Sequence, residues 1–146
     1  MQPHESISIL LVEDNDGHAK LIERNLRKVN LLNPIVRVAD GVEALDYLHG
    51  QGESNGAPPL PRLVLLDINM PRMDGMEVLS RIKSDDRLRR TPVIMLTSTD
   101  SQAEIDRCYQ SGANGYVSKP VNIANLGEKL HRLGLFLEIV ELPAVA

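Results

Sequence analysis

Polar side chains of the kind that bind metal ions and phosphate stand at the ends of four apolar runs. Carboxylates end SILLVED and RLVLLD, hydroxyls end TPVIMLTS, and an ammonium group precedes the proline in YVSKP. The residues concerned are Glu13, Asp14, Asp67, Thr97, Ser98 and Lys119. If the fold brings these run ends together, they form the parts of a phosphoryl-transfer site.

Each of these residue types has a defined role in such chemistry. Carboxylates at close range repel one another unless they are protonated or bridged by a cation, and their oxygens suit Mg²⁺. A carboxylate can also act as a nucleophile and form an aspartyl phosphate. Lys119 offers a positive charge to a phosphate oxygen, and Thr97 and Ser98 offer hydroxyl donors. Asp67, beside a metal ion and Lys119, is therefore the candidate nucleophile.

The elements that must position these residues alternate between strands and helices. Short apolar or β-branched runs predict strands at 8–14, 34–39, 62–67, 91–98 and 115–120. Helical periodicity, glycine boundaries and a stop at Gly112 predict helices at 17–29, 41–50, 75–85, 101–112 and 122–140. Strands that are apolar on both faces indicate an α/β fold, a doubly wound parallel sheet covered by helices on both sides. Ligands bind outside the carboxyl ends of such strands, where the polar run ends fall.

Length and composition limit the class of protein. The 146 residues suit one domain, and a net charge of −4 without a basic block argues against nucleic acid as a partner. No apolar run reaches the roughly 18 residues of a membrane span, and the N-terminus lacks the pattern of a signal peptide, so we expect a cytoplasmic protein with no membrane partner. One cysteine excludes an internal disulfide. The four histidines have no ligand spacing and are expected at the surface.

The segments LLVEDN, LLDINMPRMDG, MLTS and YVSKP, in this order, resemble those of response-regulator receiver domains. The resemblance covers residues 6–134 and implies a flavodoxin-like sheet of strand order 2-1-3-4-5 with five helices. It implies a stand-alone receiver of a two-component phosphorelay, a signalling module rather than an enzyme, which catalyses its own phosphorylation and dephosphorylation with Mg²⁺. Its partner would be a histidine kinase.

The resemblance also implies roles for the metal ligands and the phosphoacceptor. Asp67 accepts the phosphoryl group, and Asp14 and Asp67 bind Mg²⁺ through their side chains. Asn69 binds the metal through its backbone carbonyl. Glu13 stands where many members of the family have Asp, and it acts on the metal through water.

The same resemblance implies a switch. Lys119 contacts the phosphate, and Thr97 is the hydroxyl that turns toward it. Tyr116, on the opposite face of its strand from Lys119, moves inward together with Thr97. The surface of the fourth helix, fifth strand and fifth helix then favours a different partner.

Three features point to a subgroup of receivers. The insertion GQGESNGAPPLP, the stretch RCYQSGANGYVSKP and the extended C-terminus are similar to those of regulators paired with bacterial phytochrome kinases. Residues 135–146 begin with an apolar run, LFLEIVEL over 135–142, past the end of the receiver. We expect this extension to form a homodimer contact, and the alternative is that it folds back onto its own core.

Three other functions fit parts of the pattern. A haloacid dehalogenase-type phosphatase would need an acid two residues after the nucleophile, where this chain has Asn69. A flavin-binding module would need a phosphate-cradling loop after the first strand, but VEDNDGH is acidic. A degenerate receiver that binds without phosphate would not need the complete set of acid, threonine and lysine.

Overall fold

The strands form one parallel sheet, as predicted. The computed structural model describes residues 9–28, 34–50, 61, 63–70, 73–98 and 101–119. The strands are β1 (Ile9–Val12), β2 (Ile35–Val38), β3 (Leu63–Asp67), β4 (Val93–Thr97) and β5 (Gly115–Ser118). The helices in this part of the chain are α1 (Asp16–Lys28), α2 (Gly41–Gly50), α3 (Gly75–Ser84) and α4 (Gln102–Gln110). The predicted helix at 122–140 lies outside the described residues.

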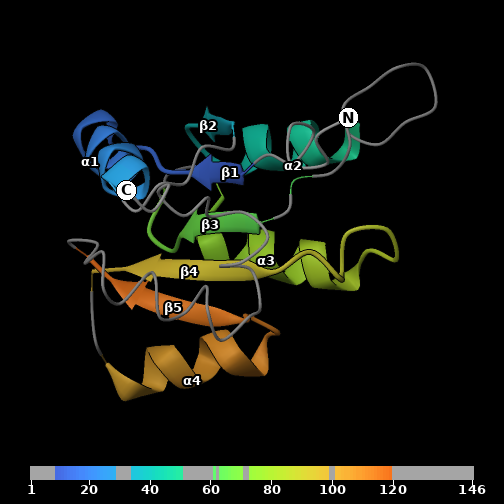
Figure 1. The fold of residues 1–146 in the computed structure, drawn as a ribbon. Helices are drawn as coiled ribbons and strands as arrows, with labels where there is room; N and C mark the ends of the chain where they lie inside the picture. The colour runs from blue at the N-terminus through green and yellow to red at the C-terminus, as the bar shows by residue number, and fades with distance from the viewer. Residues whose placement is uncertain are drawn as a thin grey trace, which may run out of the picture.

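The strand order is β2-β1-β3-β4-β5, and all neighbouring strands are parallel. Figure 1 shows this order from top to bottom, with every arrowhead pointing to the left. The chain runs from β1 outward to β2 and returns to β3 on the other side of β1, so the order reverses there. The predicted flavodoxin-like topology is confirmed, and the carboxyl ends of all strands lie at one edge.

The three central strands are buried on both faces. Every residue of β1, β3 and β4 is buried. One face packs against α1 through Ala19, Ile22 and Leu26, and the other packs against α2, α3 and Cys108 of α4. This double cover explains why the strand segments are apolar without alternation.

Capping interactions define the start of α3 and the end of α4. The Asp74 side chain caps α3 by accepting a hydrogen bond from the Glu77 N–H at 3.0 Å. Gly112 has a φ of +102°, and its N–H donates to the Tyr109 carbonyl at 3.1 Å. This turn ends α4 and directs the chain into β5, as the predicted glycine stop requires. Predicted bounds of the described elements differ from the observed ones by no more than two residues.

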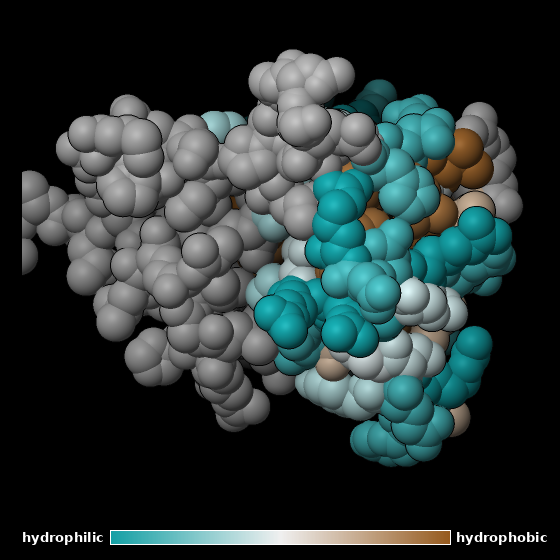
Figure 2. Space-filling view, turned by 90° about the vertical axis from the view of Figure 1, so that its right-hand side faces the viewer, coloured by the Kyte–Doolittle hydropathy of each residue, from teal (hydrophilic) through white to brown (hydrophobic). Residues whose placement is uncertain are grey.

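The described surface is largely polar. Figure 2 views the side of the molecule where the strands begin, and hydrophilic residues predominate among those it colours there. The large hydrophobic residues exposed in the described part are Leu21 of α1 and Tyr109 of α4. None of the described helices is long and apolar enough to cross a membrane.

Gly75 fixes the distance between α3 and the end of β3. A Cβ atom at this position would overlap the Asp67 carbonyl oxygen and lie 2.8 Å from the Ile68 Cα. The Gly75 N–H also donates to the Ile68 carbonyl at 2.8 Å. The absence of a side chain at Gly75 therefore sets the backbone position of Asp67.

We predict that Gly75→Ala lowers the free energy of unfolding by about 2–3 kcal/mol, because backbone atoms must separate to admit the methyl group. The midpoint of thermal unfolding should fall by about 5–10 °C. The control is Gly50→Ala, where an added Cβ meets nothing within 4 Å. Circular dichroism melts of both variants would check this, and equal midpoints would contradict it.

Candidate functional site

Three carboxylates converge at the carboxyl ends of β1 and β3. Oxygens of Glu13, Asp14 and Asp67 all lie within 4.8 Å of one another. Glu13 and Asp67 are buried, whereas Asp14 is exposed. Because parallel strands end at the same edge of the sheet, residues 54 positions apart in sequence (67 − 13) come together. The predicted convergence of the acids is confirmed.

Lys119 lies between the two buried acids. Its Nζ atom is 2.7 Å from Glu13 Oε1 and 3.1 Å from Asp67 Oδ2. The Lys119 N–H donates to the Thr97 carbonyl at 2.7 Å, which holds the end of β5 beside the end of β4. The predicted lysine, Lys119, is thus in contact with the predicted nucleophile, Asp67.

Arg37 of β2 binds the segment between β1 and α1, which contains Glu13 and Asp14. Its Nε and Nη2 atoms donate to the Glu13 carbonyl at 2.9 and 2.7 Å, and Nη1 donates to Asp16 Oδ1 at 2.6 Å. The Glu13 N–H donates to the Val38 carbonyl at 3.1 Å. Sequence reasoning missed Arg37, because a single charged residue in an edge strand has no motif. The only available indication was its place in the alternation of side chains along β2, which sets the face of the sheet on which it lies.

Burial and charge shift the acidity of the site. Burial first, and the charge of Glu13 second, raise the pKa of Asp67 from 3.8 to about 7, against the attraction of Lys119. Burial disfavours the Lys119 ammonium, but its contact with Glu13 and the charge of Asp67 together outweigh burial and raise the pKa of Lys119. The single positive charge of Lys119 therefore does not neutralise the negative charge of the carboxylates around it.

The remaining negative charge suits a divalent cation. Glu13 Oε1 is buried and, apart from its ion pair with Lys119, has no hydrogen-bond partner in the described part of the chain. Glu13 Oε2 accepts a hydrogen bond from the Asn15 N–H at 3.2 Å. Hard oxygen ligands of this kind fit Mg²⁺ or Mn²⁺. Asn69 lies beside them, and its N–H donates to Asp67 Oδ1 at 3.3 Å.

Thr97 and Tyr116 lie on neighbouring strands and both contact α4. The buried Thr97 hydroxyl donates to Glu104 Oε1 at 3.0 Å. The Tyr116 ring meets the Tyr109 ring edge to face, with centroids 6.0 Å apart and an angle of 82° between the planes. Ser98, the second predicted hydroxyl, is exposed. Sequence reasoning singled out Thr97 and Tyr116 but not Glu104, and the switch role of the first two stays a prediction.

Comparison with known proteins agrees with this geometry. Residues 9–131 match the response regulator receiver domain family. The chain belongs to this family. Among curated relatives, the probable methanogenesis regulatory protein FilR2 of Methanothrix harundinacea is 41% identical over 126 residues, covering 86% of this chain and 80% of that protein. Response regulator Rcp1 of Synechocystis is 36% identical over 137 residues, covering 93% of this chain and 92% of Rcp1.

Solved structures of response regulators are similar to this chain over almost its whole length. The bacteriophytochrome response regulator AtBRR has a TM-score of 0.81 and 40% identity, covering 95% of this chain and 98% of AtBRR. The phosphorylated cyanobacterial phytochrome response regulator RcpA has a TM-score of 0.73 and 37% identity, and the match covers 94% of this chain and 99% of RcpA. The Mn²⁺-bound form of Rcp1 has a TM-score of 0.73 and 34% identity, and the match covers 94% of this chain and 99% of Rcp1. The predicted likeness to phytochrome-associated regulators is confirmed.

His18 stands at the rim of the receiver site. Its Nδ1 atom is 3.4 Å from Lys119 Nζ and 3.9 Å from Glu13 Oε2, and about half of its side chain is exposed, at 53%. The expected surface position is correct, but its closeness to the acids was not foreseen. His18 lies in the first turn of α1, and this turn places it beside the acids. The His18 N–H donates to the Asn15 side chain at 2.9 Å, which caps the helix.

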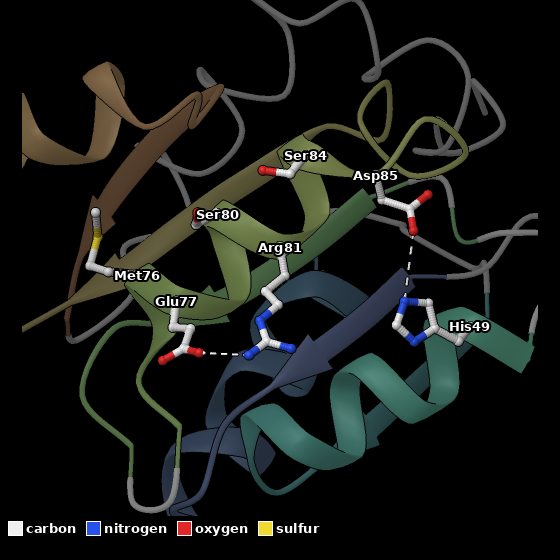
Figure 3. A pocket seen from close by; sticks show the side chains of 7 residues that line it. All are labelled: His49, Met76, Glu77, Ser80, Arg81, Ser84 and Asp85. Atoms are coloured by element: carbon white, nitrogen blue, oxygen red, sulfur yellow. Dashed lines mark hydrogen bonds and ion pairs between the residues drawn. The ribbon is translucent and has the colours of Figure 1, made fainter.

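A separate cavity of about 670 Å³ lies along α3 of the receiver. Figure 3 shows its lining, which comes from α3 and from the ends of α2 and α3. Two contacts pair its charges: Glu77 with Arg81 at 3.0 Å and His49 with Asp85 at 3.7 Å. None of the acids in the cluster described above lines it, so it is distinct from that site.

We predict that Asp67→Asn stabilises the metal-free receiver, and that it does so by more at pH 8 than at pH 5. The raised pKa of Asp67 means that the folded protein holds a proton that the unfolded chain has lost between about pH 4 and pH 7. The stability of the parent therefore falls as pH rises through this window. The variant, which carries no charge there, avoids the loss. We expect a gain on the order of 2 kcal/mol at pH 8, or about 4–8 °C.

Thermal melts in a chelating buffer at both pH values would measure this difference. Asp16→Asn is the control, because the hydrogen bond and charge of Arg37 lower the pKa of Asp16 instead. It should give no gain at pH 8. A parent whose stability rises between pH 5 and pH 8 relative to Asp67→Asn would contradict the prediction.

Proposed function

We propose that this receiver accepts a phosphoryl group on Asp67 from a histidine kinase and thereby changes its protein-binding surface. The observation that carries the proposal is the position of Asp67, buried at the carboxyl end of β3 and 3.1 Å from the Lys119 ammonium. It also shares a cluster with two further acids. The phosphorylated state of the similar RcpA supports the same assignment.

The reaction is a transfer between two nucleophiles. An Asp67 carboxylate oxygen forms a bond to phosphorus while the bond from phosphorus to the donor's imidazole nitrogen breaks, and that nitrogen keeps the electron pair. Lys119 holds a phosphoryl oxygen by charge and leaves its contact with the Asp67 carboxylate to do so. The receiver supplies this catalysis itself. Water later attacks the phosphorus in the same site, so that inorganic phosphate leaves and the Asp67 carboxylate is restored. Because the group that accepts the phosphoryl is the receiver's own side chain, we regard the protein as a signalling module rather than an enzyme.

Mg²⁺ is the cofactor that we assign to the acidic cluster. The side chains of Asp14 and Asp67 and the backbone carbonyl of Asn69 would hold it, with Glu13 acting through water. When bound, such a cation neutralises negative charge that builds on the transferring oxygens. The Mn²⁺-bound form of the similar Rcp1 supports the binding of a divalent ion by this receiver.

The change after phosphorylation begins at Thr97. New acceptor oxygens on Asp67 attract the Thr97 hydroxyl, and Tyr116 on the neighbouring strand moves inward as Thr97 moves. Both residues contact α4, so the surface formed by α4 and β5 differs between the two states. A partner that prefers one surface shifts the population toward it.

A bacterial phytochrome is the histidine kinase that we favour as donor. The likeness to AtBRR and to RcpA over almost their whole length supports this choice. FilR2 is as similar in sequence but is described as a regulator of methanogenesis, so the support comes from the phytochrome-associated structures rather than from identity alone. We place the exchange in the cytoplasm, where kinases of this class obtain ATP.

We predict that the chain gains one phosphoryl group during incubation with acetyl phosphate and Mg²⁺. Asp67→Asn should gain none, and the parent should gain none in a chelating buffer. The matched control is Asp74→Asn, which keeps the helix cap and leaves the acidic cluster intact. Intact-mass spectrometry would measure the gain. Phosphorylation of Asp67→Asn to the level of the parent would contradict the assignment.

We also infer that residues 135–146, beyond the receiver at 6–134, form a homodimer contact. The support is the apolar run LFLEIVEL in the sequence. We predict that Leu137→Glu converts a dimeric parent to a monomer, as measured by light scattering after gel filtration. Glu138→Gln, a neighbouring change in the same run, is the control. A monomeric parent, together with a lower melting point for Leu137→Glu, would instead support a tail folded onto its own domain.

A further inference from the structure

Both switch residues are bound to the same helix in this structure. The Thr97 hydroxyl donates to Glu104, and the Tyr116 ring contacts the ring of Tyr109, one and a half turns further along α4. Glu104 is half-buried and Thr97 is buried, so water has limited access to their hydrogen bond. The helix whose surface changes in the proposed switch, α4, therefore also contacts the two groups that are proposed to respond to phosphate.

The Thr97 hydroxyl can serve one acceptor at a time. A threonine hydroxyl has a single proton to donate. Its present acceptor is the Glu104 carboxylate, 3.0 Å away, on the side of α4. The oxygens of a phosphoryl group on Asp67 would be the alternative acceptor, at the ends of β3 and β4. The two anionic acceptors compete for the same proton.

We propose that Glu104 is a positioning residue that holds Thr97 in the resting orientation and thereby weakens the response of the site to phosphorylation. This inference rests on the function proposed for Asp67. Each turn of Thr97 toward Asp67 breaks a hydrogen bond to a carboxylate, which is stronger than one to a neutral acceptor. Glu104 thus sets the ratio of resting to switched receiver, whereas Lys119 and the acids set the chemistry.

Asp106 provides a control on the same helix. It carries the same charge and is exposed, but its carboxylate accepts a hydrogen bond from Gln102 Nε2 at 2.8 Å. Removal of either acid changes the net charge of α4 by one. Only Glu104→Ala frees the Thr97 hydroxyl from its acceptor on α4. Any difference between the two variants therefore reports the hydrogen bond and not the charge of the helix.

The test measures how tightly the intact chain binds beryllofluoride with Mg²⁺, because this anion on a carboxylate stands in for a phosphoryl group. Calorimetric titration should show about 3- to 10-fold tighter binding for Glu104→Ala than for the parent, the value of a partly exposed hydrogen bond to a charged group. Asp106→Ala should remain within about twofold of the parent. Glu104→Gln, which keeps a neutral acceptor, should lie between parent and alanine variant.

A double-mutant cycle with Thr97→Val isolates the contact. In the valine background, Glu104→Ala should no longer tighten binding, because no hydroxyl remains to be released. Equal affinities of Glu104→Ala and Asp106→Ala, with the parent binding normally, would overturn the role of Glu104. Persistence of the Glu104 effect in the Thr97→Val background would overturn it as well. Failure of the parent to bind beryllofluoride at all would overturn the proposed phosphoacceptor function, and this inference with it.

Discussion

The ammonium group of Lys119 between Glu13 and Asp67 is the interaction on which the site depends. Two carboxylates buried at one strand edge would repel each other strongly without a cation between them. Lys119 approaches both, at 2.7 and 3.1 Å, but Asp14 adds a third negative charge to the cluster. Three carboxylates against one ammonium leave a net negative charge. Burial first, and the charge of Glu13 second, raise the pKa of Asp67. The net negative charge also accounts for the affinity that such a cluster should have for a divalent cation.

The backbone prevents this repulsion from relaxing. Asp67 is held in the sheet between β1 and β4, and Gly75 packs directly against its carbonyl. Glu13 is held by its own N–H to Val38 and by the guanidinium of Arg37 at its carbonyl. Because both peptide groups are fixed, the acids cannot separate through a shift of the backbone. The fold thus maintains an unfavourable arrangement of charge at its active edge, a common property of functional sites.

The sequence predicted the parts of this structure that follow from periodicity and topology. Apolar runs located the strands, and parallel pairing placed the ends at Glu13, Asp67 and Thr97 on one edge. The contacts of Arg37, His18 and Glu104 could not be predicted in the same way. They depend on side-chain conformations and on how α1 and α4 lie across the strand ends. The hydrogen bond from Thr97 to Glu104, seven residues later, crosses a strand-to-helix connection, and no repeating pattern specifies its geometry.

The same distinction explains how the switch that we propose would act without rebuilding the sheet. The Thr97 carbonyl accepts the Lys119 N–H at 2.7 Å, and the β4–β5 ladder continues to the pair Thr97 and Ser118. The backbone at the phosphate-facing edge is therefore fixed in both β4 and β5. What remains free to change is the torsion of a side chain, and Thr97 has an acceptor on α4 in the orientation seen here. In the switch that we propose, a rotation about one bond decides whether that hydroxyl is bound to the helix or to the site. Since Tyr116 contacts the same helix, this switch would carry the state of the carboxylate at Asp67 to the surface of α4 through two side chains while the core stays intact.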